Sequence, residues 1–486
     1  MIRLDDLVAA VPELERRGPA HAGRYVRFCF DSRLVETGDL FVAVRTQRGD
    51  GHDFVADAWA HGAEAVLVDD ASGVPDGCPA LVVDDTVAAM ERYGAHVVRA
   101  WAPRVVAVTG TVGKTGTKEL IAEVLATRFT VFRTPGNFSG RFGLAVALGG
   151  LRPEHQVAVV EMATGHFGEI DAMCAMAPPE VGVVTAVDAA HLVALGDVDG
   201  VAREKASLVA RLPADGLAVL NADDPRVAAM AGAGPAPAVT FGDGPGSGFR
   251  ADGVALTASG TTFTCHHDGW EERVVVSFLG AHSTGAALAA LAVGERFGIG
   301  RADAVAAVGR VDALPGRLRP LAGRAGSLLL DDSYNAAPRS VLAGLDTLAA
   351  LPAGSRVAVL GDMAELGAAA EELHRAVGRT PPRRRASTPT GWPSRSRRRT
   401  PPPRSSPASA PTRWCWSRGA RWRGWSGWSS SSWPRASTSR SCWSARTGPG
   451  SPSASSSRTG PPGWRSTCRR WPITSAGWPD GHRAPR

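Results

Sequence analysis

The chain has 486 residues and a formal net charge of +7, but this charge is unevenly distributed. After Arg379 the sequence holds 21 arginines and one acid, Asp480, so this tail carries +20 and residues 1–379 carry −13. The basic pI of 9.3 therefore does not indicate a nucleic-acid-binding fold, because the part of the chain that can build a core is acidic.

The sequence also argues against a membrane or secreted protein. No apolar run reaches the roughly 18 residues that a membrane-spanning helix needs, and we expect no signal peptide. The cysteines before residue 380 lack metal-binding spacing, and we expect buried thiols in a reducing compartment at Cys29, Cys78, Cys174 and Cys265. These features predict a cytoplasmic protein.

Apolar runs alternate with helical patterns up to residue 379, which predicts an α/β fold of three domains. Residues 1–102 would form a small α/β domain. Residues 103–312 would form a central domain whose mostly parallel sheet is covered on both faces, with strands expected at 105–109, 157–162, 181–187 and 217–220. Residues 313–379 would begin a third, Rossmann-like domain that breaks off halfway.

The central domain opens with the most informative segment of the chain. A β-branched run at 105–108 leads into the glycine-rich turn Thr109-Gly110-Thr111-Val112-Gly113, and Lys114 and Thr115 then begin a helix expected to reach about Thr127. This order of strand, loop and helix predicts a phosphate cradle. Lys114 would face the β- and γ-phosphates, and Thr115 would bind Mg²⁺. The alternative is an ordinary strand–helix turn, because Val108 replaces the first glycine of the strict motif.

Further polar residues follow the predicted strands, at the carboxyl edge where α/β proteins bind ligands. Glu161 could be a metal ligand or a solvated loop acid. His191 would bind a metal only together with other ligands, and Lys205, taken alone, is typical of a solvated charge on the helix expected at 201–211. Asn221–Asp224 and Asp331–Asn335 could form simple turns or helix caps, or could contact ribose or a metal.

In their order and spacing, these residues resemble one family throughout residues 1–379: the Mur ligases, ATP-dependent amide-bond ligases of peptidoglycan precursor synthesis. The most specific segments are Pro315–Leu318, Asp331–Ala336 and Gly361–Gly367. They are similar to the branch of the family that joins D-alanyl-D-alanine to UDP-N-acetylmuramoyl-tripeptide. The resemblance implies a three-domain architecture with a central sheet of the P-loop ATPase type.

The resemblance also implies a reaction in two steps. ATP would phosphorylate a substrate carboxylate, and an amine would then displace phosphate from the acyl phosphate, releasing ADP and phosphate. The implied partners are UDP-N-acetylmuramoyl-peptide and D-alanyl-D-alanine, with ATP and Mg²⁺ as cofactors, no nucleic acid, and a monomeric enzyme.

The roles of individual residues are likewise implied by the resemblance. Catalysis would use Lys114, His191 and a carbamylated Lys205, and Mg²⁺ would be held by Thr115, Glu161 and His191. The nucleotide would lie against Thr109, Gly110, Thr111, Gly113, Lys114, Thr115, Asn221, His282, Arg317 and Asp332. The other substrates would contact Ser32, Arg33, Asn137 and Asn335.

Three departures from the family pattern keep alternatives open. Ser139-Gly140-Arg141 stands where the family usually has two asparagines, Ser283 stands in place of asparagine, and Lys205 is followed by Ala206-Ser207 rather than Gly-Glu. The chain could therefore be a diverged ligase for another acid and amine, or an inactive nucleotide-binding remnant.

The tail at 380–486 is rich in Arg, Ser, Pro and Trp and lacks Leu and Val, so we expect it to be disordered. Its composition predicts a frameshift. Reading from the third base of the Trp414 codon, with GC-rich codons, gives Val-Leu-Val-Lys-Gly-Arg-Ala-Met-Ala-Arg-Met-Glu-Arg-Val, which is typical of a buried strand, a turn and an amphipathic helix. This translation also resembles the C-terminal motif of the family. The alternative is a genuine basic tail, which would bind nucleic acid in a salt-dependent manner.

Overall fold

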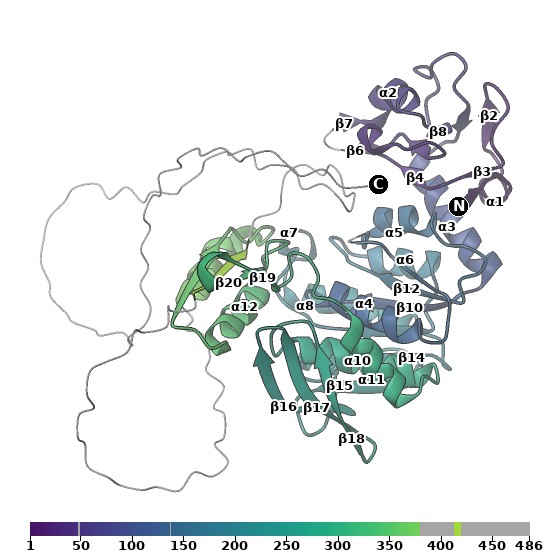
Figure 1. Cartoon of the computed structure of the whole chain (residues 1–486). Coiled ribbons are helices and arrows are strands. Elements are labelled where there is room, and N and C mark those ends of the chain that lie inside the picture. The colour runs from purple at the N-terminus through teal and green to yellow at the C-terminus, as the bar shows by residue number, and fades with distance from the viewer. Residues whose placement is uncertain (47–48, 137, 380–412, 419–486) are drawn as a thin grey trace, which may run out of the picture. The chain divides into compact units, whose positions relative to one another are not determined.

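The computed structural model describes residues 1–46, 49–136, 138–379 and 413–418, and its elements are shown in Figure 1. The N-terminal part is built on a five-stranded sheet in the order β2-β9-β8-β5-β4. Its strands are β2 (Glu15–Arg17), β9 (Ala80–Val82), β8 (Ala65–Val68), β5 (Leu40–Val42) and β4 (Phe28–Cys29). All are parallel except β2. Two short strand pairs accompany the sheet: β1 (Ile2–Arg3) with β3 (Arg24–Tyr25), and β6 (Arg45–Thr46) with β7 (Gly49–Asp50).

The helices of this part are α1 (Leu4–Ala10), α2 (Val55–Ala60) and α3 (Thr86–Trp101), with 3₁₀ turns η1 (Ser32–Leu34) and η2 (Gly51–Phe54). Asp85 caps α3 by accepting hydrogen bonds from the amides of Val87 and Ala88. Helix α3 also reaches into the next part of the chain, because Gly94 leaves room for the side chains of Leu148 and Met176. Cys29, Cys78, Cys174 and Cys265 are buried and free, as the sequence predicted.

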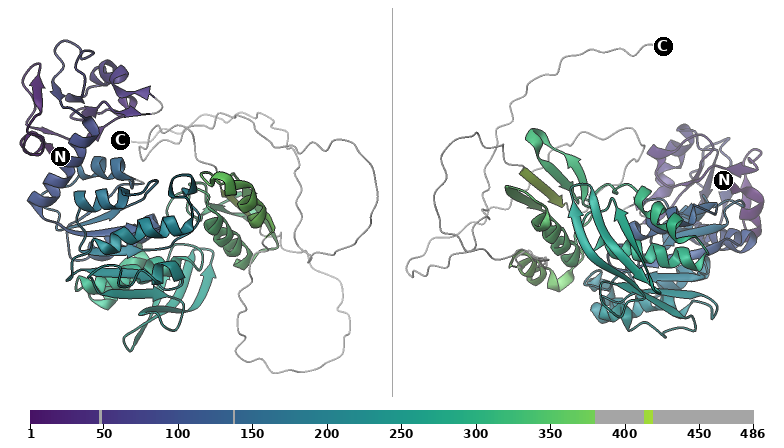
Figure 2. Two further views of the ribbon diagram at one scale, coloured as in Figure 1. Left: turned by 180° about the vertical axis from the view of Figure 1, so that it is seen from behind. Right: turned by 60° about the horizontal axis from the view of Figure 1, so that its bottom comes forward.

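A nine-stranded sheet forms the centre of the structure, in the order β11-β12-β10-β13-β14-β15-β16-β17-β18 (Figure 1). The strands are β10 (Arg104–Thr109), β11 (Val131–Arg133), β12 (Val157–Glu161), β13 (Val181–Val184), β14 (Leu217–Asn221), β15 (Ala238–Gly242), β16 (Phe249–Thr257), β17 (Gly260–His267) and β18 (Trp270–Val276). Pairing is parallel from β11 to β16 and antiparallel from β16 to β18. Figure 2 shows the long strands β16–β18, in teal, at one end of this sheet. The sheet confirms the predicted α/β class, although the strand predicted at 181–187 ends at Val184.

Side chains alternate between two cores, one on each face of the central sheet. In β10, Val106 and Val108 point into one core, and Val105 and Ala107 point into the other. Such alternation is the period of an extended strand, so a nearly continuous apolar run is what a sheet buried on both faces requires. The first core is covered by α4 (Lys114–Leu125), α10 (Ser283–Arg296) and α11 (Arg301–Arg310), and the second by α5 (Arg141–Leu148), α6 (Glu169–Met176) and α8 (Val198–Ala210). The short helices α7 (Leu192–Leu195) and α9 (Pro225–Ala228) lie in strand–helix connections.

The C-terminal part has a four-stranded sheet in the order β19-β20-β22-β21. The strands are β19 (Arg319–Ala322), β20 (Leu328–Asp331), β21 (Ser355–Leu360) and β22 (Arg413–Arg418), accompanied by α12 (Pro338–Ala350), α13 (Ala370–Arg379) and the 3₁₀ turns η3 (Arg324–Gly326) and η4 (Gly367–Ala369). Val357 and Val359 of β21 are 51% and 52% exposed, so one face of β21 lacks a covering helix in the described part of the chain. That this Rossmann-like domain is incomplete stays a prediction.

Strand β22 corrects one expectation. It lies between β20 and β21 and runs parallel to both, so the prediction of a structureless tail does not hold for these six residues. The rest of 380–486 lies outside the described residues. Within the described residues, no helix combines the length and the apolar character that crossing a membrane requires.

Leu120 in α4 is fully buried in the core beneath the central sheet, so its truncation tests the role of this core. We expect Leu120→Ala to lower the free energy of unfolding by about 2–5 kcal/mol, because lost burial and a residual cavity add. Chemical denaturation followed by circular dichroism measures this effect. The matched control is Leu34→Ala, since Leu34 is 39% exposed. Equal shifts for the two variants would contradict the assignment of the core.

Candidate functional site

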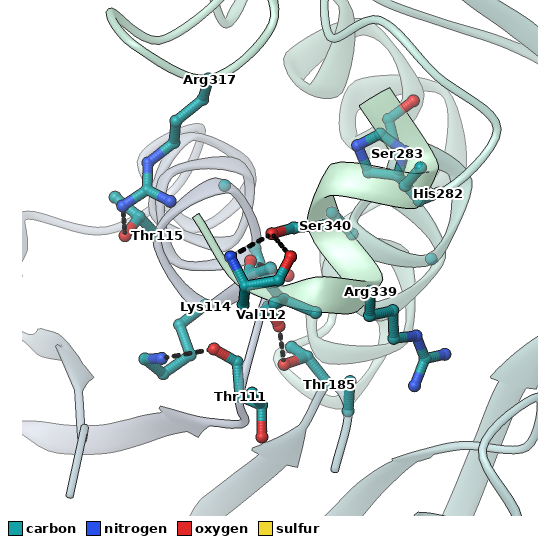
Figure 3. A pocket seen from close by; sticks show the side chains of 18 of the residues that line it. Thr111, Val112, Lys114, Thr115, Thr185, His282, Ser283, Arg317, Arg339 and Ser340 are labelled. Atoms are coloured by element: carbon teal, nitrogen blue, oxygen red, sulfur yellow. Dashed lines mark hydrogen bonds between the residues drawn. The ribbon is translucent and has the colours of Figure 1, made fainter. Parts of the chain in front are cut away.

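The loop between β10 and α4 has a shape that glycine permits. Gly110 has a φ of +147° and Gly113 a φ of +86°, both in the region that residues with side chains disfavour. A Cβ added to Gly110 would meet Oγ1 of Thr185 at 2.0 Å. That hydroxyl is fixed because it donates to the carbonyl oxygen of Val112 (2.6 Å), drawn in Figure 3, and lies 3.2 Å from the carbonyl oxygen of Thr109. The loop is thus held tightly against the end of β13, with its backbone open to a ligand at the N-terminus of α4.

Lys114 and Thr115 occupy the first turn of α4, as the sequence predicted. The ammonium of Lys114 donates to the carbonyl oxygens of Gly110 (2.8 Å) and Thr111 (3.3 Å). Burial lowers the pKa of Lys114, and the charge of Glu161 partly opposes this shift. An ammonium that is held by neutral carbonyls in a half-buried loop is suited to receive a phosphate, whose charge would stabilise it.

Arg317 reaches this loop from the C-terminal part of the chain. Its Nη2 donates to Oγ1 of Thr115 at 2.8 Å (Figure 3). Its guanidinium lies 4.4 Å from the ring centre of Tyr334. The next residue, Leu318, has a φ of +52°, which is rare for a β- or γ-branched side chain and indicates local strain. The strained turn at Leu318 therefore directs the Arg317 guanidinium towards Thr115, which is predicted to bind Mg²⁺.

Glu161 and Thr115 offer hard oxygen ligands beside the loop. Glu161 ends β12 and is 3% exposed, so its interpretation as a solvated acid is wrong. Its Oε2 is buried without a hydrogen-bond partner, which is costly unless a cation neutralises it. The described residues contain no cluster of three or more His, Cys, Asp or Glu side chains that could hold a metal alone. This set fits Mg²⁺, which takes one or two protein ligands and completes its shell with water and phosphate oxygens.

His191 lies at the N-cap of α7 with a φ of +53°. Its Nδ1 is 2.7 Å from Oε2 of Glu365, which belongs to the C-terminal part of the structure. Glu365 also has a positive φ, of +64°. A carboxylate on one ring nitrogen orients the other, which is the usual arrangement of a metal-binding histidine. The geometry is therefore compatible with the predicted role of His191.

Lys205 is buried in α8, at 3% exposure, so its interpretation as a solvated surface charge is wrong. Burial and the charge of Lys114 lower the pKa of Lys205 to about 7, and the adjacent Glu204 opposes this shift. Near neutral pH, a large fraction of the molecules therefore carries Lys205 as an uncharged amine. Glu204 is held in turn by the backbone amides of Gly168 (2.8 Å) and Ile170 (2.9 Å).

A cavity of about 1940 Å³ joins most of these residues. It is lined by the phosphate loop from Thr111 to Thr117 and by polar residues that the sequence singled out: Glu161, His191, Asn221, His282, Arg317, Asp332 and Asn335. A cavity of this size, with a cationic loop at one end, can hold a nucleotide and a second substrate.

Some predicted site residues lie elsewhere. Thr109 is fully buried and donates from Oγ1 to the carbonyl of Met162, so it supports the loop from behind and, like Gly110 and Lys205, is not among the lining residues. Ser32 donates to Asp57 and Arg33 pairs with Asp31 in the N-terminal part, again away from the lining of this cavity. Asn137 lies outside the described residues.

The structure adds residues that the sequence did not single out. Arg339 of α12 pairs with Asp224 at 2.7 Å, and the same Oδ2 of Asp224 accepts the amide of Val187 (3.0 Å). Thr185 and Glu365 also contact site residues, as described above. Asp224 and Glu365 belong to sequence clusters that were recognised as motifs, whereas no local pattern marks Arg339 or Thr185.

Comparison with known proteins shows which family the chain is similar to. Family models match three stretches: the Mur ligase family catalytic domain at residues 28–127, the Mur ligase middle domain at 108–294, and the Mur ligase glutamate ligase domain at 316–387. UDP-N-acetylmuramoyl-tripeptide–D-alanyl-D-alanine ligase of Escherichia coli (strain K12) is 37% identical over 350 residues, which cover 72% of this chain and 77% of the relative.

Solved structures give the same result. A crystal structure of MurF from Acinetobacter baumannii superposes with a TM-score of 0.70 at 30% identity, covering 78% of this chain and 83% of the other. MurF ligase from Thermotoga maritima in complex with ADP has a TM-score of 0.64 at 28% identity, covering 72% and 81%.

The conformation of Gly110 makes it a sensitive test of the loop. We expect Gly110→Ala to weaken the binding of Mg²⁺-ATP about tenfold or more, because the Cβ would displace Thr185 and strain the backbone. Isothermal titration calorimetry measures this affinity. Gly73→Ala is the control, since its Cβ would meet nothing within 4 Å. Unchanged affinity in the Gly110 variant would show that the nucleotide does not use this loop.

Proposed function

This chain belongs to the Mur ligase family, and we propose that it is the ATP-dependent ligase that adds D-alanyl-D-alanine to UDP-N-acetylmuramoyl-tripeptide. One observation carries the proposal: the phosphate loop, the buried Glu161, His191 and Arg317 meet around one cavity. The E. coli relative, a UDP-N-acetylmuramoyl-tripeptide–D-alanyl-D-alanine ligase, supports the choice of substrates. The enzyme would act as a monomer in the cytoplasm, where ATP is available.

The proposed chemistry activates a carboxylate that is otherwise a poor electrophile. The terminal carboxylate of the peptide would attack the γ-phosphorus of ATP, which forms an acyl phosphate and releases ADP. The amine of D-alanyl-D-alanine would then add to the acyl carbon, and the tetrahedral intermediate would collapse with loss of phosphate. The protein contributes mainly orientation and charge neutralisation.

The residues around the phosphate loop would have separate roles in the first step. Lys114 would neutralise charge on the phosphoryl group as it is transferred. Arg317, which already donates to Thr115, would contact the γ-phosphate. Thr115 and Glu161 would hold Mg²⁺, which shields the phosphate charge when bound. Asp332 would contact the ribose, and Asn221 and His282 the adenine side of the nucleotide, since all three line the cavity.

The second step would use His191 and Lys205. His191, oriented by Glu365, would serve a second metal position near the acyl phosphate. Carbamylation would convert Lys205 from a cation into an anion, which suits a place near metal and removes its repulsion with Lys114. Ser32 and Arg33 would bind the UDP-linked substrate, and Asn137 and Asn335 would also contact the substrates.

A second candidate keeps the chemistry and changes the substrates. Arg141, in a segment where the family usually has asparagines, pairs with Glu91 of α3, and the neighbouring Ser139 and Gly140 line the cavity. This favours a diverged ligase for another acid and amine. Phosphate release measured with different acid–amine pairs distinguishes the two candidates, and an inactive remnant would release none.

Lys114 provides the direct test of the proposed reaction. We expect Lys114→Ala to abolish phosphate release from ATP in the presence of both substrates, because the transferring phosphoryl group loses the cation that neutralises it. A coupled phosphate assay measures this. Arg324→Ala, in an exposed turn of the C-terminal part, is the control. Retained activity in the Lys114 variant would refute its assigned role.

The lowered pKa of Lys205 predicts its modification. Carbon dioxide reacts with an uncharged amine, and a pKa of about 7 makes this form abundant at pH 8 and scarce at pH 6. We expect ¹³C-bicarbonate to give a carbamate signal in the NMR spectrum at pH 8 that weakens towards pH 6. The signal should vanish in Lys205→Met; its persistence there would place the carbamate on another amine.

A further inference from the structure

The chain uses lysine very sparingly. Three lysines occur among its 54 basic residues: Lys114, Lys118 and Lys205. Two of them belong to the proposed catalytic machinery. Lys118 is the third, and it follows Lys114 by four residues in α4, so the two lie on the same side of this helix.

Lys118 is fully buried, with an exposed fraction of 0%. Its Nζ donates to the carbonyl oxygens of Thr134 (2.5 Å) and Gly136 (3.3 Å) and lies 2.9 Å from Oε1 of Glu119. An ammonium has three protons, and three acceptors surround this one. The larger, planar guanidinium of arginine does not suit so compact a set of acceptors, which explains why lysine stands here in an arginine-rich chain.

The segment that Lys118 holds also contacts Glu161. Oγ1 of Thr134 accepts the backbone N–H of Glu161 at 3.1 Å, and the amide of Thr134 donates to the carbonyl of Val159 at 3.1 Å. Thr134 itself is 1% exposed. A continuous series of hydrogen bonds therefore leads from the ammonium of Lys118 through Thr134 to the end of β12, where the Glu161 carboxylate begins.

We propose that Lys118 is a positioning residue, which fixes residues 134–136 against α4 and, through Thr134, directs the Glu161 carboxylate towards the Mg²⁺ of the bound nucleotide. The proposal rests on the proposed function in one respect only, the assignment of Glu161 as a metal ligand. Lys118 touches neither nucleotide nor metal in this role, because its side chain is fully enclosed.

The experiment separates positioning from simple stabilisation by measuring metal affinity. Mn²⁺ replaces Mg²⁺ and is titrated by electron paramagnetic resonance in the presence of saturating ADP, while chemical denaturation reports stability. The test variants are Lys118→Met and Thr134→Val, with Thr134→Ser as the conservative variant that keeps the hydroxyl. Thr127→Val is the matched control, because the Thr127 hydroxyl bonds only the local helix end at Val124.

We expect Lys118→Met and Thr134→Val to weaken Mn²⁺ binding about 10–100-fold, as loss of a partner that orients a metal ligand does. Thr134→Ser and Thr127→Val should stay near the wild-type affinity. The double variant should bind no more weakly than the poorer single variant, because both changes break one series of contacts. If Lys118→Met does not fold, Thr134→Val against Thr134→Ser decides the question.

Wild-type Mn²⁺ affinity in both Lys118→Met and Thr134→Val, with lowered stability, would overturn the inference and leave these residues a purely structural role. The proposed function is judged separately by phosphate release. A wild-type chain that binds Mn²⁺ with ADP but ligates nothing would refute the function while the titration still decides the role of Lys118. A wild-type chain that binds no Mn²⁺ with ADP would overturn both.

Discussion

The parallel pairing of β10 with β12 on one side and β13 on the other is the constraint on which the site depends. In this register Val108 lies opposite Glu161 and Val183, so the three strands end at one level. Strand β14 continues the same alignment, with Val184 opposite Leu220. Residues far apart in the sequence thus lie at one edge of one sheet. A slip of a single residue would move each side chain of the slipped strand to the opposite core and shift its polar end away from this edge.

Much of this edge could be predicted from local sequence, because the signals are local. The glycine turn before Lys114 and the apolar run before Glu161 identify a loop and a strand end without knowledge of the partners. The environment of Lys205 could not be predicted, because its burial depends on how α8 packs against the face of the central sheet opposite to α4. Arg339 and Asp224 pair across more than a hundred residues, and no periodicity encodes such a contact. The frameshift stays a prediction, although β22 includes the codons that the shifted frame translates as an apolar strand.

Charge explains why the site is poised for an anion. Desolvation and a neighbouring positive charge lower the pKa of both lysines, with Arg317 acting on Lys114 and Lys114 acting on Lys205. Glu161 is the acid that opposes the shift at Lys114. A phosphate chain placed among these groups would relieve their mutual repulsion, so the binding of nucleotide and the packing of the C-terminal residues on the loop favour each other. The contacts of Arg317, Arg339 and Glu365 with Thr115, Asp224 and His191 join the C-terminal part to the site.

The position of β22 has a consequence for how the chain matures. Strand β22 begins at Arg413 and fills the middle of its sheet, whereas its neighbours β20 and β21 end at Asp331 and Leu360. During synthesis both neighbours therefore leave the ribosome long before the strand that joins them, each with an unsatisfied edge. Such edges invite pairing with other chains, and a closure between distant segments is slow to form. Assembly of the C-terminal sheet should consequently be the last and most aggregation-prone step in the biogenesis of this protein, after the central sheet has already formed its own cores.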